Sequence, residues 1–322
     1  MKCYFCLTAP DNANLVYANL FELSLSSALY NTNLTISILY DGDINHKCYK
    51  IIEKYQSLFS DRINIINHKF SHKKYLPTVY PKNYFEKMHF TPISYDKLAG
   101  TFMRLDIPFL EKEEDYVFYT DIDVYFQSNV SLEVLKLPKY LSAAPEFNKN
   151  IKNEKYFNAG VLLLNVKNMQ EKCNKIFCDL SKGIPNKTGM YDQGFLNQYC
   201  FDDFDILPNE YNWKPYWGIN HKAKIVHYHG MKPGGTYKNS GFAMNEKLLY
   251  EMTNLYPDSV SGLIYYSQIY FKETENIPSE WLAEFVQNIV YINQKRISKN
   301  LNIINTQDLK HVLKTYINKK LK

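Results

Sequence analysis

The chain has 322 residues, of which 45% are apolar and 16% are aromatic, so it can bury a sizeable core. Its longest apolar runs are far shorter than the roughly 20 residues that a bilayer requires, so we expect no membrane-spanning helix. The N-terminal residues lack the apolar centre of a secretory signal, and the six cysteines show no disulfide spacing. These features predict a globular protein of the cytoplasm.

The net charge of +5 is concentrated near the C-terminus. Residues 281–322 carry eight Lys or Arg against Glu284 and Asp308, a net charge of +6, so residues 1–280 sum to about −1. Because the positive charge is confined to one end and no known nucleic-acid motif is present, we expect no nucleic-acid partner. Apolar residues from Trp281 to Val290 recur at helical spacing, which suits core packing, whereas the basic residues suit an anionic membrane surface.

Strand and helix patterns alternate over the first 66 residues. The predicted strands are residues 2–7, 34–40 and 63–66, and the predicted helices are residues 15–29 and 49–59. This alternation is typical of an α/β fold with a mostly parallel central sheet flanked by helices. Ligands bind such sheets at the carboxyl ends of the strands, which here points to Asp11 and Asn12 and to residues 41–43.

Residues 68–98 have little periodicity and are too many for an ordinary connection. They include six Lys, three His and many aromatic residues. Three interpretations remain open for this segment: a lid over the donor, a loop that binds the acceptor, or a partly disordered stretch.

The next predicted strand, residues 116–120, is apolar enough to be buried and leads directly into Asp121, Ile122 and Asp123. Alternate residues of an extended chain project to the same side, so both carboxylates can face one divalent cation. The pattern Asp-x-Asp also occurs at residues 41–43 and 203–205. Only the pair at Asp121 and Asp123 follows a convincing buried strand, which favours it as the metal site.

Four further segments occur in a fixed order around this pair. They are residues 104–108 (RLDIP), 156–165 (YFNAGVLLLN), 191–197 (YDQGFLN) and 225–235 (IVHYHGMKPGG). Together with the Asp pair, over roughly residues 1–240, their order and spacing resemble the family 8 glycosyltransferases. This group includes bacterial lipopolysaccharide galactosyltransferases and glycogenin.

The resemblance implies a GT-A fold, a nucleotide-sugar donor that is usually linked to UDP, Mn²⁺, and retention of the anomeric configuration. By position, the metal ligands would be Asp121, Asp123 and His227. The nucleotide and diphosphate would be bound by Asp11, Asn12, Ile122, Gly230 and Lys232. The donor sugar would be surrounded by Arg104, Asn158, Asp192 and Gln193.

Local patterns leave alternatives open for several of these residues. His229 is a rival to His227, Arg104 could pair with Asp106, and Asp192 could cap a helix N-terminus. A nitrogen ligand among carboxylates favours Mn²⁺ over Mg²⁺, with Mg²⁺ as the alternative. Gln193 is a poor nucleophile, so we expect the acceptor to attack the donor sugar from the face that the diphosphate leaves.

The sequence therefore predicts a GT-A catalytic domain over residues 1–255 and a helical, basic region over residues 256–322. The predicted function is a retaining, metal-dependent hexosyltransferase that uses a UDP-sugar and a glycan acceptor such as lipopolysaccharide or another cell-surface saccharide. It would act in the cytoplasm, and a further expectation is that it attaches peripherally to the inner membrane face. The alternatives are a self-glycosylating protein glycosyltransferase like glycogenin and a non-catalytic module that binds nucleotide sugars or glycans.

Overall fold

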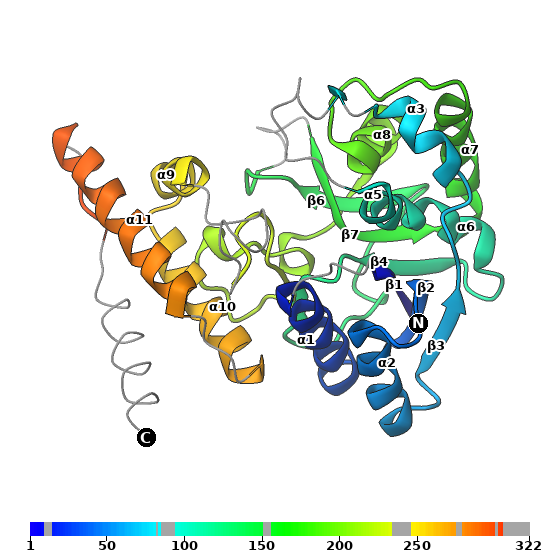
Figure 1. Ribbon diagram of the computed structural model, residues 1–322, viewed down its shortest axis with the longest axis horizontal. Helices are drawn as coiled ribbons and strands as arrows, with labels where there is room; N and C mark the ends of the chain where they lie inside the picture. The colour runs from blue at the N-terminus through cyan, green and yellow to red at the C-terminus, as the bar shows by residue number, and fades with distance from the viewer. Residues whose placement is uncertain are drawn as a thin grey trace.

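The computed structural model describes residues 1–9, 15–81, 83–84, 94–150, 156–233, 246–274, 279–299 and 302–304. Within these residues, seven strands form the main sheet in the order β3-β2-β1-β4-β7-β6-β8 (Figure 1). The strands are β1 (Lys2–Ala9), β2 (Thr35–Gly42), β3 (Ile63–Asn67), β4 (Tyr116–Thr120), β6 (Leu141–Pro145), β7 (Phe157–Asn165) and β8 (Asp205–Ile206). All of them run in one direction except β7, which is antiparallel to both of its neighbours. The predicted mostly parallel α/β sheet is thus confirmed.

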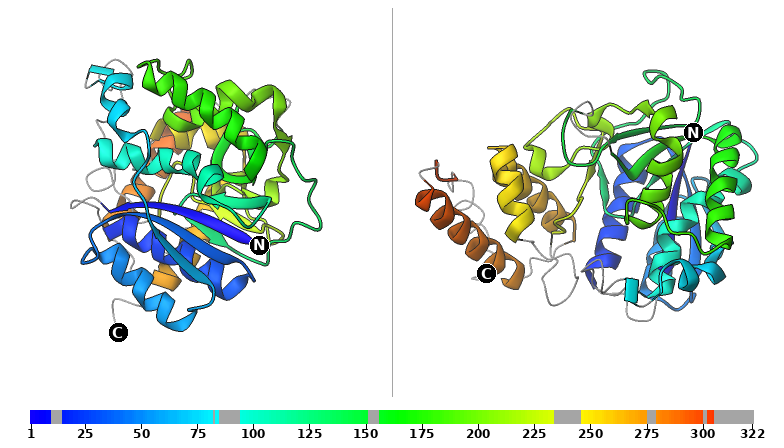
Figure 2. Two further views of the ribbon diagram at one scale, coloured as in Figure 1. Left: turned by 90° about the vertical axis from the view of Figure 1, so that its right-hand side faces the viewer. Right: turned by 90° about the horizontal axis from the view of Figure 1, so that it is seen from above.

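Strand β1 is buried on both faces because it lies between two layers of helices. Cys3 and Phe5 pack into one apolar cluster with α1 (Leu15–Asn31) and α2 (Lys47–Leu58). Tyr4 packs into the opposite cluster, which also contains residues of α3 (Leu76–Val79), α5 (Tyr95–Phe102), α6 (Ile107–Leu110), α7 (Val166–Ser181) and α8 (Tyr191–Cys200). Two turned views show the sheet enclosed between these layers (Figure 2). Continuous apolar strands are typical of a sheet covered on both faces.

The described part of residues 68–98 contains the short 3-10 helix η1 (Lys73–Tyr75), α3 and the start of α5. It is anchored on Asp106, whose carboxylate accepts hydrogen bonds from the Ser71 backbone N–H at 2.9 Å and from its hydroxyl at 2.6 Å. His68 Nε2 lies 2.7 Å from the same carboxylate. Residue 82 and residues 85–93 lie outside the described residues, so the lid and acceptor-loop interpretations stay predictions.

A small second sheet joins two segments that are far apart in the sequence. Strand β5 (Val124–Phe126) pairs antiparallel with β9 (Ile225–His227), with Val124 opposite His227. The turn before β5 is fixed from below by α1, because the hydroxyl of Ser24 donates to the Ile122 and Val124 carbonyl oxygens at 2.6 and 2.7 Å. This pairing brings His227 beside the two aspartates that follow β4.

The C-terminal helices α9 (Glu246–Leu255), α10 (Ser259–Thr274) and α11 (Ser279–Ser298) share a third apolar cluster with part of α1. They form a separate helical layer beside the α/β body (Figure 1). Helix α10 also packs on the 3-10 helix η6 (Pro215–Trp217), where a Cβ at Gly262 would overlap the Pro215 carbonyl oxygen. No described helix is long and apolar enough to cross a membrane. The domain boundary after residue 255 stays a prediction, and the lysines from Lys310 onward lie outside the described residues.

Glu111 provides a test of the packing at the amino ends of β1 and β4. Its buried carboxylate accepts from the Tyr4 hydroxyl at 2.7 Å, from Lys2 Nζ at 3.1 Å and from the backbone N–H groups of residues 112–114. Burial alone would raise the pKa of Glu111, but these hydrogen bonds lower it from 4.5 to about 2. The stability that the carboxylate contributes is therefore present above pH 4.5 and lost as the pH falls through about 2.

We expect Glu111→Gln to lower the free energy of unfolding at neutral pH by roughly 1–3 kcal/mol and to flatten its decline in acid. Urea denaturation at a series of pH values measures both effects. The exposed neighbour Glu113, changed to Gln, is the matched control and should keep the parent's pH dependence. An unchanged acid profile for Glu111→Gln would contradict the assignment.

Candidate active site

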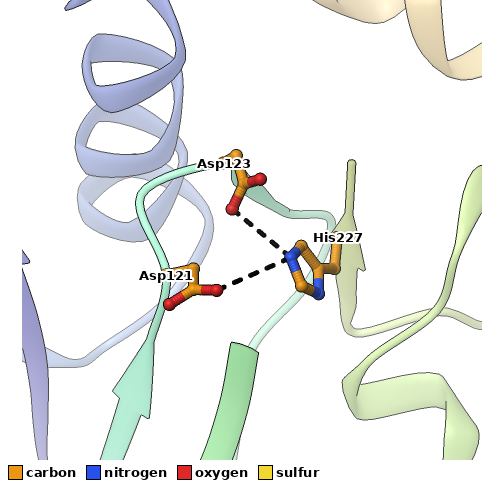
Figure 3. A group of neighbouring side chains, drawn as sticks. All are labelled: Asp121, Asp123 and His227. Atoms are coloured by element: carbon orange, nitrogen blue, oxygen red, sulfur yellow. Dashed lines mark ion pairs between the residues drawn. The ribbon is translucent and has the colours of Figure 1, made fainter. Parts of the chain in front are cut away.

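Asp121, Asp123 and His227 converge where β4 ends and β5 meets β9 (Figure 3). His227 Nε2 lies 3.3 Å from Asp123 Oδ1 and 3.9 Å from Asp121 Oδ2. Among the described residues, these three form the one group of three or more His, Cys, Asp or Glu side chains whose ligand atoms all lie within 4.8 Å of one another. Two hard carboxylate oxygens and one imidazole nitrogen are a donor set that fits Mn²⁺ or Mg²⁺.

Each carboxylate of the pair has one oxygen held by the protein and one facing His227. Asp121 Oδ1 accepts from the Tyr119 hydroxyl at 2.6 Å and from Arg104 Nη2 at 2.8 Å. Asp123 Oδ2 contacts Lys232 Nζ, which also donates to the Tyr228 carbonyl oxygen at 2.8 Å. The oxygens that remain, Asp121 Oδ2 and Asp123 Oδ1, are the ones nearest the imidazole.

The protonation states around this group suit a bound cation. Burial alone would raise the pKa of Asp123, but Lys232 and His227 together outweigh burial and hold the pKa well below its usual range. Burial lowers the pKa of His227, and the Asp123 carboxylate offsets this only in part. An ionised carboxylate and a neutral imidazole are the forms that bind metal ions.

Arg104 pairs with Asp121 and links it to Asp192 of α8. It is only 6% exposed, stacks on the Tyr119 ring at 4.3 Å, and lies 2.9 Å from Asp192 Oδ2 through Nε. The predicted alternative partner of Arg104, Asp106, instead binds His68 and Ser71. The two carboxylate partners of Arg104, Asp121 and Asp192, both follow it in the sequence. Its predicted place beside the donor sugar stays a prediction.

Asp192 has an oxygen that accepts no hydrogen bond. It is the second residue of α8 and 4% exposed, and the nearby Arg104 Nε–H donates instead to the Thr101 carbonyl oxygen at 2.9 Å. Burial raises the pKa of Asp192 to about 6, although the guanidinium acts in the opposite direction. Asp192 Oδ2 is thus paired with the Arg104 guanidinium by charge but accepts no well-directed hydrogen bond among the described residues, which leaves it able to accept one from a ligand hydroxyl.

Asn158 and Gln193 meet at Glu146, a residue that the motif analysis missed. Asn158 Nδ2 and Gln193 Nε2 donate to Glu146 Oε2 at 2.7 and 3.1 Å. Gln193 Oε1 accepts from the Ala159 backbone N–H at 2.8 Å. Burial alone would raise the pKa of Glu146, but His229, the Asn158 amide and the Lys214 ammonium lower it to about 2. Glu146 directly follows β6, so the strand-end rule would have identified it had β6 been recognised.

His229 does not join the metal-ligand group within the described residues. Its Nε2 lies 2.9 Å from Glu146 Oε1, and its Nδ1 lies 2.9 Å from the Tyr216 hydroxyl. Of the other predicted nucleotide-binding residues, Ile122 lies between the aspartates and Gly230 has a positive φ of 76°. Asp11 and Asn12 lie outside the described residues, so their placement beside the base stays a prediction.

Gly160 lies against His227 and offers a way to move the imidazole without changing a ligand. The pairing of β7 with β6 shifts register between Ala143 and Ala144 of β6. A Cβ at Gly160 would overlap the His227 ring. We expect Gly160→Ala to weaken Mn²⁺ binding by roughly 10-fold or more, measured by calorimetry. The control is Ala159→Gly, because the Ala159 side chain points away from His227 into the apolar cluster formed with α3, α5, α6, α7 and α8. Equal Mn²⁺ affinity in parent and Gly160→Ala would contradict this placement.

The family model described as "Glycosyl transferase family 8" matches residues 12–234. No curated protein matches the chain. Among solved structures, the galactosyltransferase LgtC, in complex with donor and acceptor sugar analogs, superimposes with a TM-score of 0.52 at 19% identity. That match covers 88% of this chain and 100% of LgtC.

The glycosyltransferase GlyE of Streptococcus pneumoniae TIGR4 superimposes with a TM-score of 0.50 at 21% identity, over 86% of this chain and 64% of GlyE. At these identities the likeness to solved structures concerns the fold, and it confirms the expected GT-A architecture. The family match spans more than half of the sequence and contains the segments that carry the resemblance, from residue 104 onward, except residue 235 at the end of the last one. The chain therefore belongs to glycosyl transferase family 8.

Proposed function

We propose that this protein is a retaining hexosyltransferase that uses a UDP-sugar, a divalent cation and a glycan acceptor, with Mn²⁺ preferred over Mg²⁺. The observation that carries the proposal is the convergence of Asp121, Asp123 and His227 at the carboxyl end of β4. His227 lies about 100 positions after the two aspartates in the sequence, and the pairing of β5 with β9 brings it beside them. In a family 8 glycosyltransferase, such a group has an immediate use in binding a nucleoside diphosphate.

Asp121, Asp123 and His227 would hold the cation, which when bound supplies Lewis-acid stabilisation of the leaving diphosphate. Lys232 lies at the same place, with its ammonium against Asp123. A lysine there can follow the diphosphate and neutralise charge that develops as the sugar leaves. Gly230, in the left-handed region, gives the chain the turn that brings Lys232 back over the aspartates.

Asp192 and Arg104 would fix the donor sugar. The Asp192 oxygen that lacks a donor is suited to a sugar hydroxyl, and Arg104 holds the carboxylate in place. Arg104 also pairs with Asp121, so the residue that would orient the sugar and a residue that would bind the cation share one guanidinium. Such a shared, buried support suits the precise placement that group transfer requires.

Gln193 supports attack by the acceptor from the face that the diphosphate leaves. Its amide oxygen accepts from the Ala159 N–H at 2.8 Å and is 3.4 Å from Asn158 Nδ2, so both of its lone pairs are engaged. Its amide nitrogen donates to Glu146. An amide that is poorly nucleophilic and fully hydrogen bonded is unsuited to form a covalent sugar intermediate, which favours direct transfer to the acceptor hydroxyl.

The test is UDP release from a panel of UDP-sugars, with Mn²⁺ and with a chelator. We expect turnover of one sugar that depends on the metal and falls by more than about 100-fold in Asp123→Ala, because loss of mere supporting groups already costs about 10–100-fold. Asp203→Ala is the matched control, since Asp203 belongs to another Asp-x-Asp pair and is an exposed residue that pairs with Lys172, away from the site.

Two other results would redirect or end the proposal. A hexose added to the protein itself, seen by mass spectrometry with donor alone, would make the chain its own acceptor, as in glycogenin. No turnover and no calorimetric binding of any UDP-sugar in the presence of Mn²⁺ would contradict the proposed function and leave only the family and fold.

The proposal also places the C-terminal helices at an anionic membrane surface, where a lipid-linked acceptor would be met. Helix α11 and the residues after it expose the apolar side chains of Val290, Ile297 and Ile303. Lys295 lies over the ring of Tyr291, and Arg296 and Lys299 follow on the same helix or at its end. Apolar, aromatic and basic side chains together are typical of surfaces that bind the headgroup region of a bilayer.

Neutralising three of these charges tests the membrane part. Each basic residue near an anionic surface contributes about 1 kcal/mol, so Lys295→Gln/Arg296→Gln/Lys299→Gln should weaken co-sedimentation with phosphatidylserine vesicles by roughly 100-fold. The control carries the same change at three exposed lysines elsewhere, Lys47, Lys167 and Lys182. Vesicle binding that is indifferent to anionic lipid would contradict this part and leave the transferase proposal untouched.

A further inference from the structure

A chain of buried hydrogen bonds connects His227 to a carboxylate on the far side of the site. His227 Nδ1 lies 3.1 Å from Asn212 Oδ1, and Asn212 Nδ2 donates to Asn158 Oδ1 at 2.9 Å. Asn158 Nδ2 in turn donates to Glu146 Oε2 at 2.7 Å. All four side chains are buried, with Asn212 fully so and His227 and Asn158 each 2% exposed. Neither Glu146 nor Asn212 was among the residues that the motifs singled out.

The direction of this chain is set at Asn158 by two groups that cannot reverse. The Gly160 backbone N–H can only donate, and it lies 3.0 Å from Asn158 Oδ1. The ionised Glu146 carboxylate can only accept, and it faces Asn158 Nδ2. The oxygen and nitrogen of the Asn158 amide are therefore assigned from its neighbours, without reference to His227.

The assignment then passes along the chain to the imidazole. Because Asn158 presents its oxygen, the atom of Asn212 that faces it must be the amide nitrogen. The other end of the Asn212 side chain is then the oxygen, and it faces His227 Nδ1. This oxygen, 3.1 Å from Nδ1, is closer to the ring than Asp123 Oδ1, which lies 3.3 Å from Nε2, and so favours a proton on Nδ1. A neutral ring with Nδ1–H has a bare Nε2.

We propose that Asn212 is a positioning residue that holds His227 as the Nδ1–H tautomer, so that the lone pair of Nε2 faces Asp121 and Asp123. This inference rests on the proposed function, because it assigns the role of the ring to a metal site. A lone pair and two carboxylate oxygens that face one another repel, and a divalent cation among them removes the repulsion. The amide chain thus prepares a cation site before any ligand arrives.

The same carboxylate also supports the other side of the site. Glu146 Oε2 accepts from Gln193 Nε2 at 3.1 Å, while Glu146 Oε1 lies 2.9 Å from His229 Nε2. The buried Glu146 carboxylate therefore orients two amides. It holds the Asn158 amide beside the metal-ligand group and the Gln193 amide beside the place proposed for the sugar. This use of His229, as a partner of Glu146, accounts for a second histidine that does not bind the metal group.

The tautomer can be read directly in the metal-free protein. Two-bond ¹H–¹⁵N correlation spectra of protein with ¹⁵N-labelled histidine distinguish Nδ1–H from Nε2–H, and a His227→Gln difference spectrum assigns the signal among the eight histidines. The spectra are recorded at a pH well above the ordinary imidazole pKa. We expect His227 to be the Nδ1–H tautomer, and an Nε2–H tautomer in the parent protein would overturn the proposal.

Two substitutions at Asn212 distinguish the role of its amide oxygen from the role of its side-chain volume. Asn212→Leu removes the acceptor, so the ring should become Nε2–H, donate to Asp123 and lose roughly 10- to 100-fold in Mn²⁺ affinity by calorimetry. Asn212→Asp keeps an acceptor and should keep Nδ1–H, which also tests the idea if the Leu variant does not fold. Asn197→Leu, an equal change at a buried amide that binds Phe157, is the matched control and should keep Nδ1–H.

An Asn212→Leu variant that retains both Nδ1–H and the parent Mn²⁺ affinity would also overturn the proposal. Failure of the proposed function gives a different pattern, namely no UDP-sugar turnover or binding whichever tautomer is found. The spectra require neither metal nor donor, so the two failures are distinguishable.

Discussion

The site depends on accommodating three carboxylates, those of Asp121, Asp123 and Asp192, in a region that is largely withdrawn from water. Asp123 is 8% exposed and Asp192 is 4% exposed, so neither can rely on solvent to stabilise its charge. Arg104 pairs with two of the three, and Lys232 pairs with the third. Removing one partner from such a buried set leaves an uncompensated charge. The resulting loss of stability is larger than the stability that the intact pairs contribute.

This arrangement leaves room for more positive charge. Three carboxylates face one guanidinium and one ammonium, and the imidazole of His227 is neutral because burial lowers its pKa. A divalent cation and a diphosphate together would reorganise the balance, because the cation can take the free oxygens of Asp121 and Asp123 while Lys232 turns to the phosphate. The surplus of negative charge is thus consistent with a site that can accept a divalent cation.

The sequence alone predicted where residues lie that follow the ends of strongly apolar strands. Asp121 and Asp123 follow a strand of strongly apolar residues, so their position at the carboxyl end of the sheet could be predicted from one segment alone. Glu146 escaped because β6 has the sequence Leu-Ser-Ala-Ala-Pro, which has a weak strand propensity. That strand forms because β7 and β8 pair with it on both sides, and no local pattern contains this information.

Asn212 could not be predicted for a related reason, and it connects the site to the C-terminal helices. Its partners are Asn158, 54 residues away, and His227, and neither contact follows from local spacing. Asn212 lies just before η6, the segment on which α10 packs so closely that Gly262 has no room for a Cβ. The helical region therefore packs against the loop that carries Asn212, and this packing comes from a helix that lies beyond the segment matched by the family model.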